Sequence, residues 1–70
     1  MSESVYKVIE VVGASPESWE KAAAIAIATA AKSLQDIRVG EVTSMDVHLD
    51  GTTIIYRTKI KLSFKYHTDE

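Results

Sequence analysis

The stretch LDGTTIIYRTKIKLSFKY, residues 49–66, alternates apolar and polar side chains almost without interruption. Side chains along a β-strand point to opposite faces in turn, so this alternation predicts one long strand with an apolar face and a basic face. A strand of about 13 residues extends roughly 43 Å, at about 3.3 Å per residue. The basic face carries Arg57, Lys59, Lys61 and Lys65.

The dipeptide Asp50-Gly51 comes just before this strand and is a strong signal for a two-residue hairpin turn. Residues 36–49 are therefore predicted as an antiparallel partner strand, with Leu49 opposite Thr52. The same pairing also sets Val47 opposite Ile54, Met45 opposite Tyr56 and Thr43 opposite Thr58.

Continued along the hairpin, this pairing places Glu41 on the apolar face, opposite Ile60. A carboxylate is unfavourable there unless the strand changes its register or leaves the cover of its own helix. We expect either a β-bulge near Gly40, which would turn Glu41 to the other face, or an uncovered end of the hairpin.

The first half of the chain predicts a strand and then a helix. Residues 5–12 are short and β-branched, which is typical of a strand. Ser15 can cap a helix over residues 16–34, in which Pro16 suits the first position and Glu17 the positive end of the helix dipole. The expected apolar stripe of this helix is mostly alanine and consists of Trp19, Ala23, Ala26, Ile27, Ala30 and Leu34.

These elements predict an α+β fold in which residues 1–70 form one domain of order β-α-β-β. We expect a three-stranded antiparallel sheet with one helix on one face. A helix of about 19 residues is roughly 28 Å long, shorter than the hairpin. The uncovered apolar residues are therefore predicted to meet other copies of the chain in a homo-oligomer, and they include Ile55, Leu62, Phe64 and Tyr66.

Composition narrows the function classes. The absence of cysteine excludes disulfides and thiolate metal sites, and a net charge of −2 argues against nucleic acid as a partner. No secretory signal is visible, and the apolar run at residues 22–31 is too short to span a membrane, which favours a cytoplasmic protein. His48 and His67 have no acid or serine partner at an interpretable spacing, and the chain has no Gly-rich phosphate loop, so an enzyme is not expected.

One family resemblance covers residues 5–66. The run YKVIEVVGASPESWEKAAAIAIATAAKSLQDIRVGEV, followed by a long Asp-Gly hairpin ending in KLSFKY, resembles the dodecins. The resemblance implies a β-α-β-β protomer and a hollow, roughly spherical dodecamer of 23 symmetry. It also implies that the chain stores or buffers a small ligand or ion without catalysis.

The resemblance also indicates which ligands to expect. Many dodecins bind flavin at subunit interfaces through a tryptophan two residues before the glutamate of the EV pair, and through a glutamine in the third strand. The corresponding positions here are Val39, Glu41 and Arg57. Valine has no π-face and arginine no acceptor, which predicts weak or absent binding of riboflavin or FMN. Ser18-Trp19 and the DIRV run at residues 36–39 resemble the calcium-dodecin branch, so calcium is the other expected ligand.

Asp46 and His48 are the candidate metal ligands. Together with Asp50 they occupy every second position of the second hairpin strand and so share one face. That spacing could offer oxygen ligands to a hard cation. The spacing is not that of an EF-hand loop, and a ring of acids around a symmetry axis is an alternative arrangement.

Two features allow two interpretations each. Trp19 either stacks on a ligand or anchors the first helical turn. The basic strand face either binds an anion, such as a phosphate or nucleotide, or lies in solvent paired with Asp46, Glu41 and Glu10. The competing function is a purely structural homo-oligomer without a physiological ligand.

Overall fold

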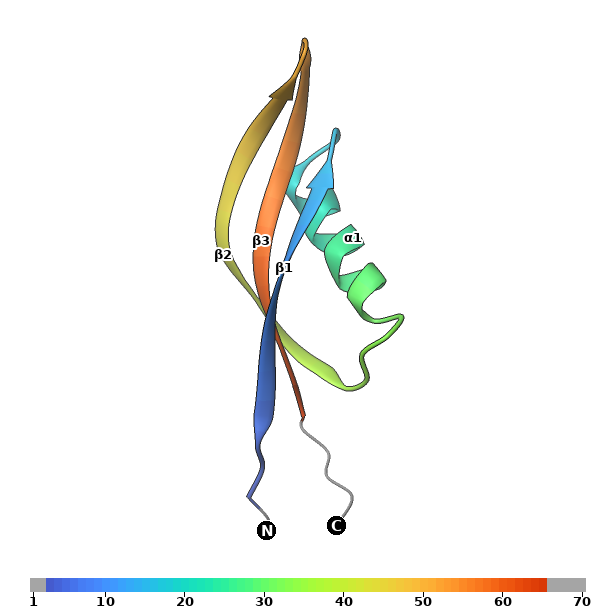
Figure 1. Cartoon of the computed structure of the whole chain (residues 1–70), viewed down its shortest axis with the longest axis vertical. Coiled ribbons are helices and arrows are strands. Elements are labelled where there is room, and N and C mark those ends of the chain that lie inside the picture. Colours follow the sequence, from blue (N-terminus) through green and yellow to red (C-terminus); the bar gives the residue numbers. More distant parts are fainter. Residues whose placement is uncertain (1–2, 66–70) are drawn as a thin grey trace.

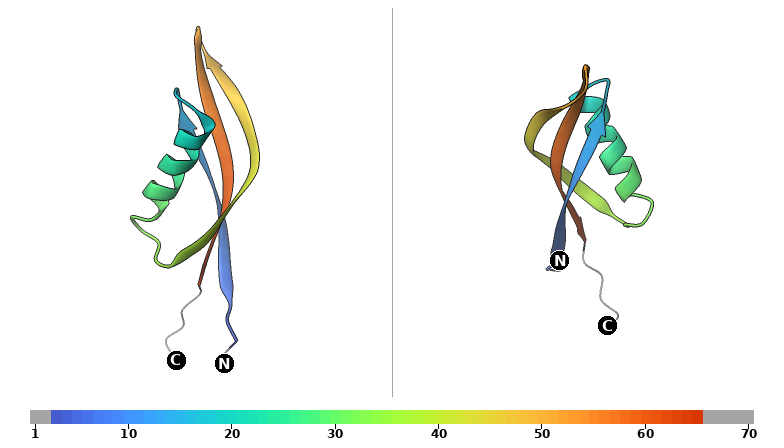
Figure 2. Two further views of the ribbon diagram at one scale, coloured as in Figure 1. Left: turned by 180° about the vertical axis from the view of Figure 1, so that it is seen from behind. Right: turned by 45° about the horizontal axis from the view of Figure 1, so that its top comes forward.

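The computed structural model describes residues 3–65 as one sheet and one helix. The elements follow in the order β1 (Tyr6–Ser15), α1 (Trp19–Ala30), β2 (Ile37–Asp50) and β3 (Thr53–Lys65). The sheet is antiparallel with strand order β1-β3-β2, so β3 lies in the centre. Helix α1 covers one face, and the tip of the β2–β3 hairpin extends beyond it (Figures 1 and 2). The predicted α+β class and the β-α-β-β order are confirmed.

The helix is shorter than predicted, with 12 residues in place of about 19. The expected start was wrong because two serines compete for the capping role. Ser18 is the N-cap, and its hydroxyl oxygen accepts a hydrogen bond from the Lys21 N–H at 3.0 Å. Ser15 is instead the last residue of β1, where its hydroxyl oxygen accepts from the Glu17 N–H at 3.0 Å.

The helix also ends earlier than predicted. Residues 31–33 continue only as turns, closed by a hydrogen bond from the Leu34 N–H to the Ala30 carbonyl at 3.0 Å. Asp36 then adopts a left-handed backbone with φ 60°, which directs the chain into β2. Within the described residues 3–65, no helix combines the length and the apolar character needed to cross a membrane.

The small hydrophobic core lies between the helix and the half of β3 that is farther from the hairpin turn. Ile60 and Leu62 are 1% and 0% exposed and pack with the buried Ala26. The prediction that Leu62 lies beyond the helix is therefore wrong. Because β1 pairs with β3 and α1 returns alongside β1, the helix lies over this part of β3 (Figure 1). Phe64 is partly buried, and Tyr66 lies outside the described residues.

Helix and sheet approach each other closely at Gly13. A Cβ atom built there would lie 1.9 Å from the Ala22 carbonyl oxygen. Ala22 is fully buried although the predicted stripe omits it, while Ile27 of that stripe is 38% exposed. Small residues on both elements thus let the helix backbone lie almost directly on β1.

The hairpin turn is displaced by one residue from its predicted place. Gly51 and Thr52 form the turn, with Gly51 at φ 64°, and Asp50 pairs with Thr53. The predicted partner of each tip residue was therefore wrong by two positions. The faces were nevertheless correct, because a shift of two residues leaves each side chain on its side of the sheet.

The expected change of register is confirmed. Register shifts occur between Val42 and Ser44 and between Ile37 and Val39, on either side of Gly40. The first shift turns Glu41 to the face away from the helix, where it lies opposite Lys61 instead of Ile60. The bulge thus removes the carboxylate from the apolar face.

Candidate functional site

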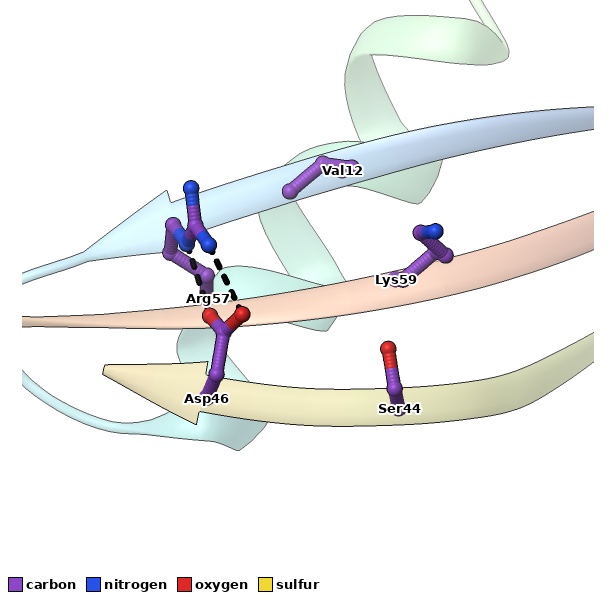
Figure 3. Close-up of a pocket in the computed structure, with 5 residues that line it drawn as sticks. All are labelled: Val12, Ser44, Asp46, Arg57 and Lys59. Carbon is purple, nitrogen blue, oxygen red and sulfur yellow. Dashed lines mark hydrogen bonds and ion pairs between the residues drawn. The ribbon is translucent and has the colours of Figure 1, made fainter. Parts of the chain in front are cut away.

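The face of the sheet opposite the helix contains a hollow of about 270 Å³. Its lining comes from all three strands: Val12 of β1, Ser44 and Asp46 of β2, and Arg57 and Lys59 of β3 (Figure 3). We call it the open-face hollow. Val12 and Ser44 are the register partners of Lys59 on its two sides. Sequence reasoning missed both residues because their positions depend on the strand order and on the bulge beside Ser44.

An ion pair closes one side of the open-face hollow. Arg57 Nε donates to Asp46 Oδ1 and Arg57 Nη2 donates to Asp46 Oδ2, both at 2.7 Å (Figure 3). These hydrogen bonds lower the pKa of the Asp46 carboxyl below its ordinary 3.8 and raise the pKa of Arg57. The charge of nearby Lys59 also lowers the Asp46 pKa. The two side chains remain about half exposed, so water screens the pair.

On the helix side of the sheet, Trp19 joins α1 to the hairpin. Its indole N–H donates to the Asp46 carbonyl oxygen at 3.0 Å, and its own carbonyl accepts from the Thr58 hydroxyl at 3.0 Å. Its ring meets the Tyr56 ring edge to face, with the centroids 5.0 Å apart. These contacts confirm the interpretation of Trp19 as a structural anchor.

The predicted metal ligands share one face but do not form a metal cluster within one chain. Asp46, His48 and Asp50 lie opposite Arg57, Ile55 and Thr53, respectively. Among residues 3–65, no group of three or more His, Cys, Asp or Glu side chains is placed to hold a metal ion. Both carboxylate oxygens of Asp46 are already bonded to Arg57.

The three residues expected at a flavin site from the resemblance lie apart on the open face. Val39 pairs with Ser63 and Glu41 with Lys61, whereas Arg57 is six residues away from Ser63 along β3. That separation is roughly 20 Å at about 3.3 Å per residue. Val39 is 57% exposed and presents no ring. One chain therefore does not bring these three residues into one pocket.

Apolar side chains gather on the helix-side face of the hairpin tip, beyond the helix. They are 44–67% exposed, and we call them the apolar tip: Met45, Val47, Leu49 and Ile54. The tip continues into an apolar groove beside the helix start, lined by residues that include Trp19 and Val42. The surplus apolar surface predicted from the strand length is thus present at the turn end of the hairpin. Exposed apolar side chains also lie near the other end of β3, among them Tyr6, Val8 and Val39.

Known proteins show where this fold recurs. The dodecin family model matches residues 5–67. The calcium dodecin of Mycobacterium tuberculosis is 51% identical over 63 residues, which cover 89% of both chains. The crystal structure of that calcium dodecin, described as having a novel calcium-binding site, matches with a TM-score of 0.85 at 47% identity over 96% of this chain and 97% of that one. Dodecin from Streptomyces coelicolor matches with a TM-score of 0.90 at 28% identity, over 99% and 100% of the two chains. The chain therefore belongs to the dodecin family.

Proposed function

We propose that this chain is a non-catalytic protein that binds and buffers calcium, and that it works as a hollow homododecamer. The observation that carries the proposal is the 51% identity to a calcium dodecin across 89% of the chain. The similarity of the backbone to the structure of that calcium dodecin supports it, at a TM-score of 0.85.

The apolar surface that a single chain leaves exposed supports assembly. The core contains few large side chains, whereas Leu49 and Val47 of the apolar tip are 67% and 48% exposed. Surfaces of this kind usually mark interfaces between proteins. Size-exclusion chromatography with light scattering tests the assembly. We expect a mass near twelve times the 7.7 kDa of one chain, and a monomer at micromolar concentration would refute the proposal.

We propose Asp46 and His48 as contributors to the calcium site. One chain supplies too few ligands beside them, because Ca²⁺ takes six to eight oxygen ligands. Further ligands would come from neighbouring subunits around a symmetry axis, and Arg57 would have to release the Asp46 carboxylate. Calcium binding at this place thus requires both assembly and the opening of an ion pair.

Calorimetric titration of chelator-treated protein with CaCl₂ tests the calcium site, with MgCl₂ as the comparison. We expect saturable calcium binding that falls at least about tenfold in Asp46→Asn, since a charged ligand is lost. His48→Ala should reduce it by a smaller factor, because an imidazole nitrogen is a weaker ligand for Ca²⁺ than a carboxylate oxygen. Full calcium affinity in both variants would remove these residues from the site while leaving calcium binding itself intact.

The competing function is a structural oligomer without a ligand. Elemental analysis and an absorption spectrum of freshly purified protein separate the two functions. Calcium in the sample and heat on titration support the buffering role. A colourless, calcium-free sample that gives no heat with CaCl₂ would favour the structural role.

A further inference from the structure

The open-face hollow holds many more hydrogen-bond donors than free acceptors. The Arg57 guanidinium carries five N–H groups, of which two are bonded to Asp46. The Lys59 ammonium has three donors and the Ser44 hydroxyl one. The only carboxylate is that of Asp46, and both of its oxygens accept from Arg57. With two cations and one anion, the hollow has a net positive charge.

Lys59 differs from its neighbour Lys61 in what flanks it. Both lysines lie on the open face of β3, two residues apart. The register partners of Lys61 are Glu10 and Glu41, so a carboxylate lies across from it on each neighbouring strand. The partners of Lys59 are Val12 and Ser44, which carry no charge. The strand pairing thus places no carboxylate directly across from Lys59, and the nearby Asp46 carboxylate is already bonded to Arg57.

We propose that the open-face hollow binds a phosphoryl group, as inorganic phosphate or as part of a phosphomonoester. A phosphoryl group presents several acceptor oxygens, which matches donors arriving from two adjacent strands. Lys59 supplies the central charge, Arg57 its unused N–H groups and Ser44 its hydroxyl, while Val12 forms an apolar wall (Figure 3). The proposal goes beyond calcium buffering, because it assigns an anion to this face.

Asp46 has two opposite effects on such a ligand. Its hydrogen bonds hold the guanidinium in place beside the hollow, and its charge cancels one of the two cations there. Replacing it with asparagine keeps a hydrogen-bond acceptor but removes the negative charge. Phosphate affinity should therefore rise in Asp46→Asn, whereas calcium affinity should fall if the proposed calcium site is right. The two proposals can thus fail independently.

The test is a calorimetric titration of the assembled protein with inorganic phosphate, at low ionic strength and with EDTA so that residual calcium cannot bridge. We expect saturable binding that weakens as NaCl is added, because the site is exposed. Lys59→Gln should weaken it about tenfold through loss of a charge-assisted hydrogen bond. Lys61→Gln is the matched control, with the same substitution on the same face, and should change the affinity less than about twofold.

Lys59→Arg keeps the charge and should keep most of the affinity for phosphate. It thereby shows that a loss of affinity in Lys59→Gln is not caused by misfolding.

Adenosine monophosphate and adenosine distinguish the two sources of the phosphoryl group. Equal affinity for phosphate and the monophosphate assigns the site to the phosphoryl group alone, and tighter binding of the monophosphate assigns it to a phosphomonoester. Adenosine binding as tightly as its monophosphate would overturn the proposal. So would equal losses in Lys59→Gln and Lys61→Gln, weaker phosphate binding in Asp46→Asn, or no saturation in the wild type.

Discussion

The indole N–H of Trp19 donates to the backbone carbonyl of Asp46, at 3.0 Å, and so ties the first turn of the helix to the edge strand β2. The side chain of the same aspartate bonds to Arg57 on the opposite face of the sheet. Asp46 is therefore held from both faces of the sheet. At this residue the hairpin is attached to the start of α1.

Trp19→Phe should lower the free energy of unfolding by about 1–2 kcal/mol. Phenylalanine keeps an edge contact to Tyr56 but loses the N–H donor and leaves the Asp46 carbonyl without it. Urea unfolding followed by circular dichroism measures the change, with both proteins at one concentration because the proposed assembly would contribute to stability. An unchanged midpoint would mean that water replaces the indole without loss.

Gly13→Ala should destabilise the fold strongly, by about 3 kcal/mol or more, since the new methyl group meets helix backbone. Its Cβ would lie 1.9 Å from the Ala22 carbonyl oxygen. Gly40→Ala is the control, because its nearest neighbour is Cδ2 of Leu62 at 3.4 Å, an ordinary van der Waals distance. Thermal unfolding of the two variants should differ clearly. Similar melting temperatures would contradict the close approach of α1 to β1.

Stability should decrease in acid partly through Asp46. Its pKa is lower in the folded chain than the ordinary 3.8, chiefly because of the hydrogen bonds from Arg57. A carboxyl group with a lowered folded pKa contributes stability that is complete above the unfolded value and disappears as the pH falls through the folded value. Urea unfolding at pH 7 and pH 3 should therefore show a smaller acid loss in Asp46→Asn than in the wild type. An equal loss would indicate that other carboxyl groups account for it.

The alternating stretch and the Asp-Gly turn were sufficient to predict the fold class, the hairpin and the faces of its strands between the turn and the bulge. Beyond the bulge, Val42 was wrongly expected on the face of Asp46 and lies opposite Ile60 instead. Period-two alternation depends on local geometry, so a turn displaced by one residue left the faces intact. The strand order was not predictable in this way, because the pairing of β1 with β3 is a long-range contact. That pairing decides which half of β3 the helix covers, and it explains why Leu62 is core and Leu49 is not.

The candidate site was predicted only in part. The basic face of β3 was correctly identified, but the alternation could not distinguish Lys59 from Lys61. The two lysines differ in their register partners on the neighbouring strands. On the β2 side these partners depend on the bulge between Val42 and Ser44. The ion pair of Arg57 with Asp46 was foreseen only as a general pairing of that face with acids.

Flavin should bind at least about tenfold more weakly than to a dodecin with tryptophan and glutamine at the positions of Val39 and Arg57. The missing ring removes a stacking contribution of roughly 1–3 kcal/mol. FMN should bind better than riboflavin, because the basic open face favours its phosphate. Quenching of flavin fluorescence on titration measures both affinities. Sub-micromolar quenching by riboflavin would show that an aromatic side chain from a neighbouring subunit takes over the stacking.

The apolar tip should carry the assembly in place of the strand end first expected to do so. Leu62 is 0% exposed within one chain and Phe64 is already partly buried, so neither has much surface left to give to a neighbour. Leu49 is 67% exposed and Ile54, its register partner, 44%. Fully burying one such side chain between subunits contributes about 1.5–3 kcal/mol, and the loss is repeated in every copy.

Leu49→Ser should therefore shift the protein toward smaller species in light scattering and make its melting temperature more dependent on concentration. Thr52→Ser, in the adjacent turn, changes the tip without removing a large apolar side chain and should leave the assembly intact. Phe64→Ala should lower the melting temperature through lost packing inside the protomer, with a smaller effect on the mass of the assembly. If Phe64→Ala dissociates the oligomer while Leu49→Ser does not, the interface lies at the other end of β3.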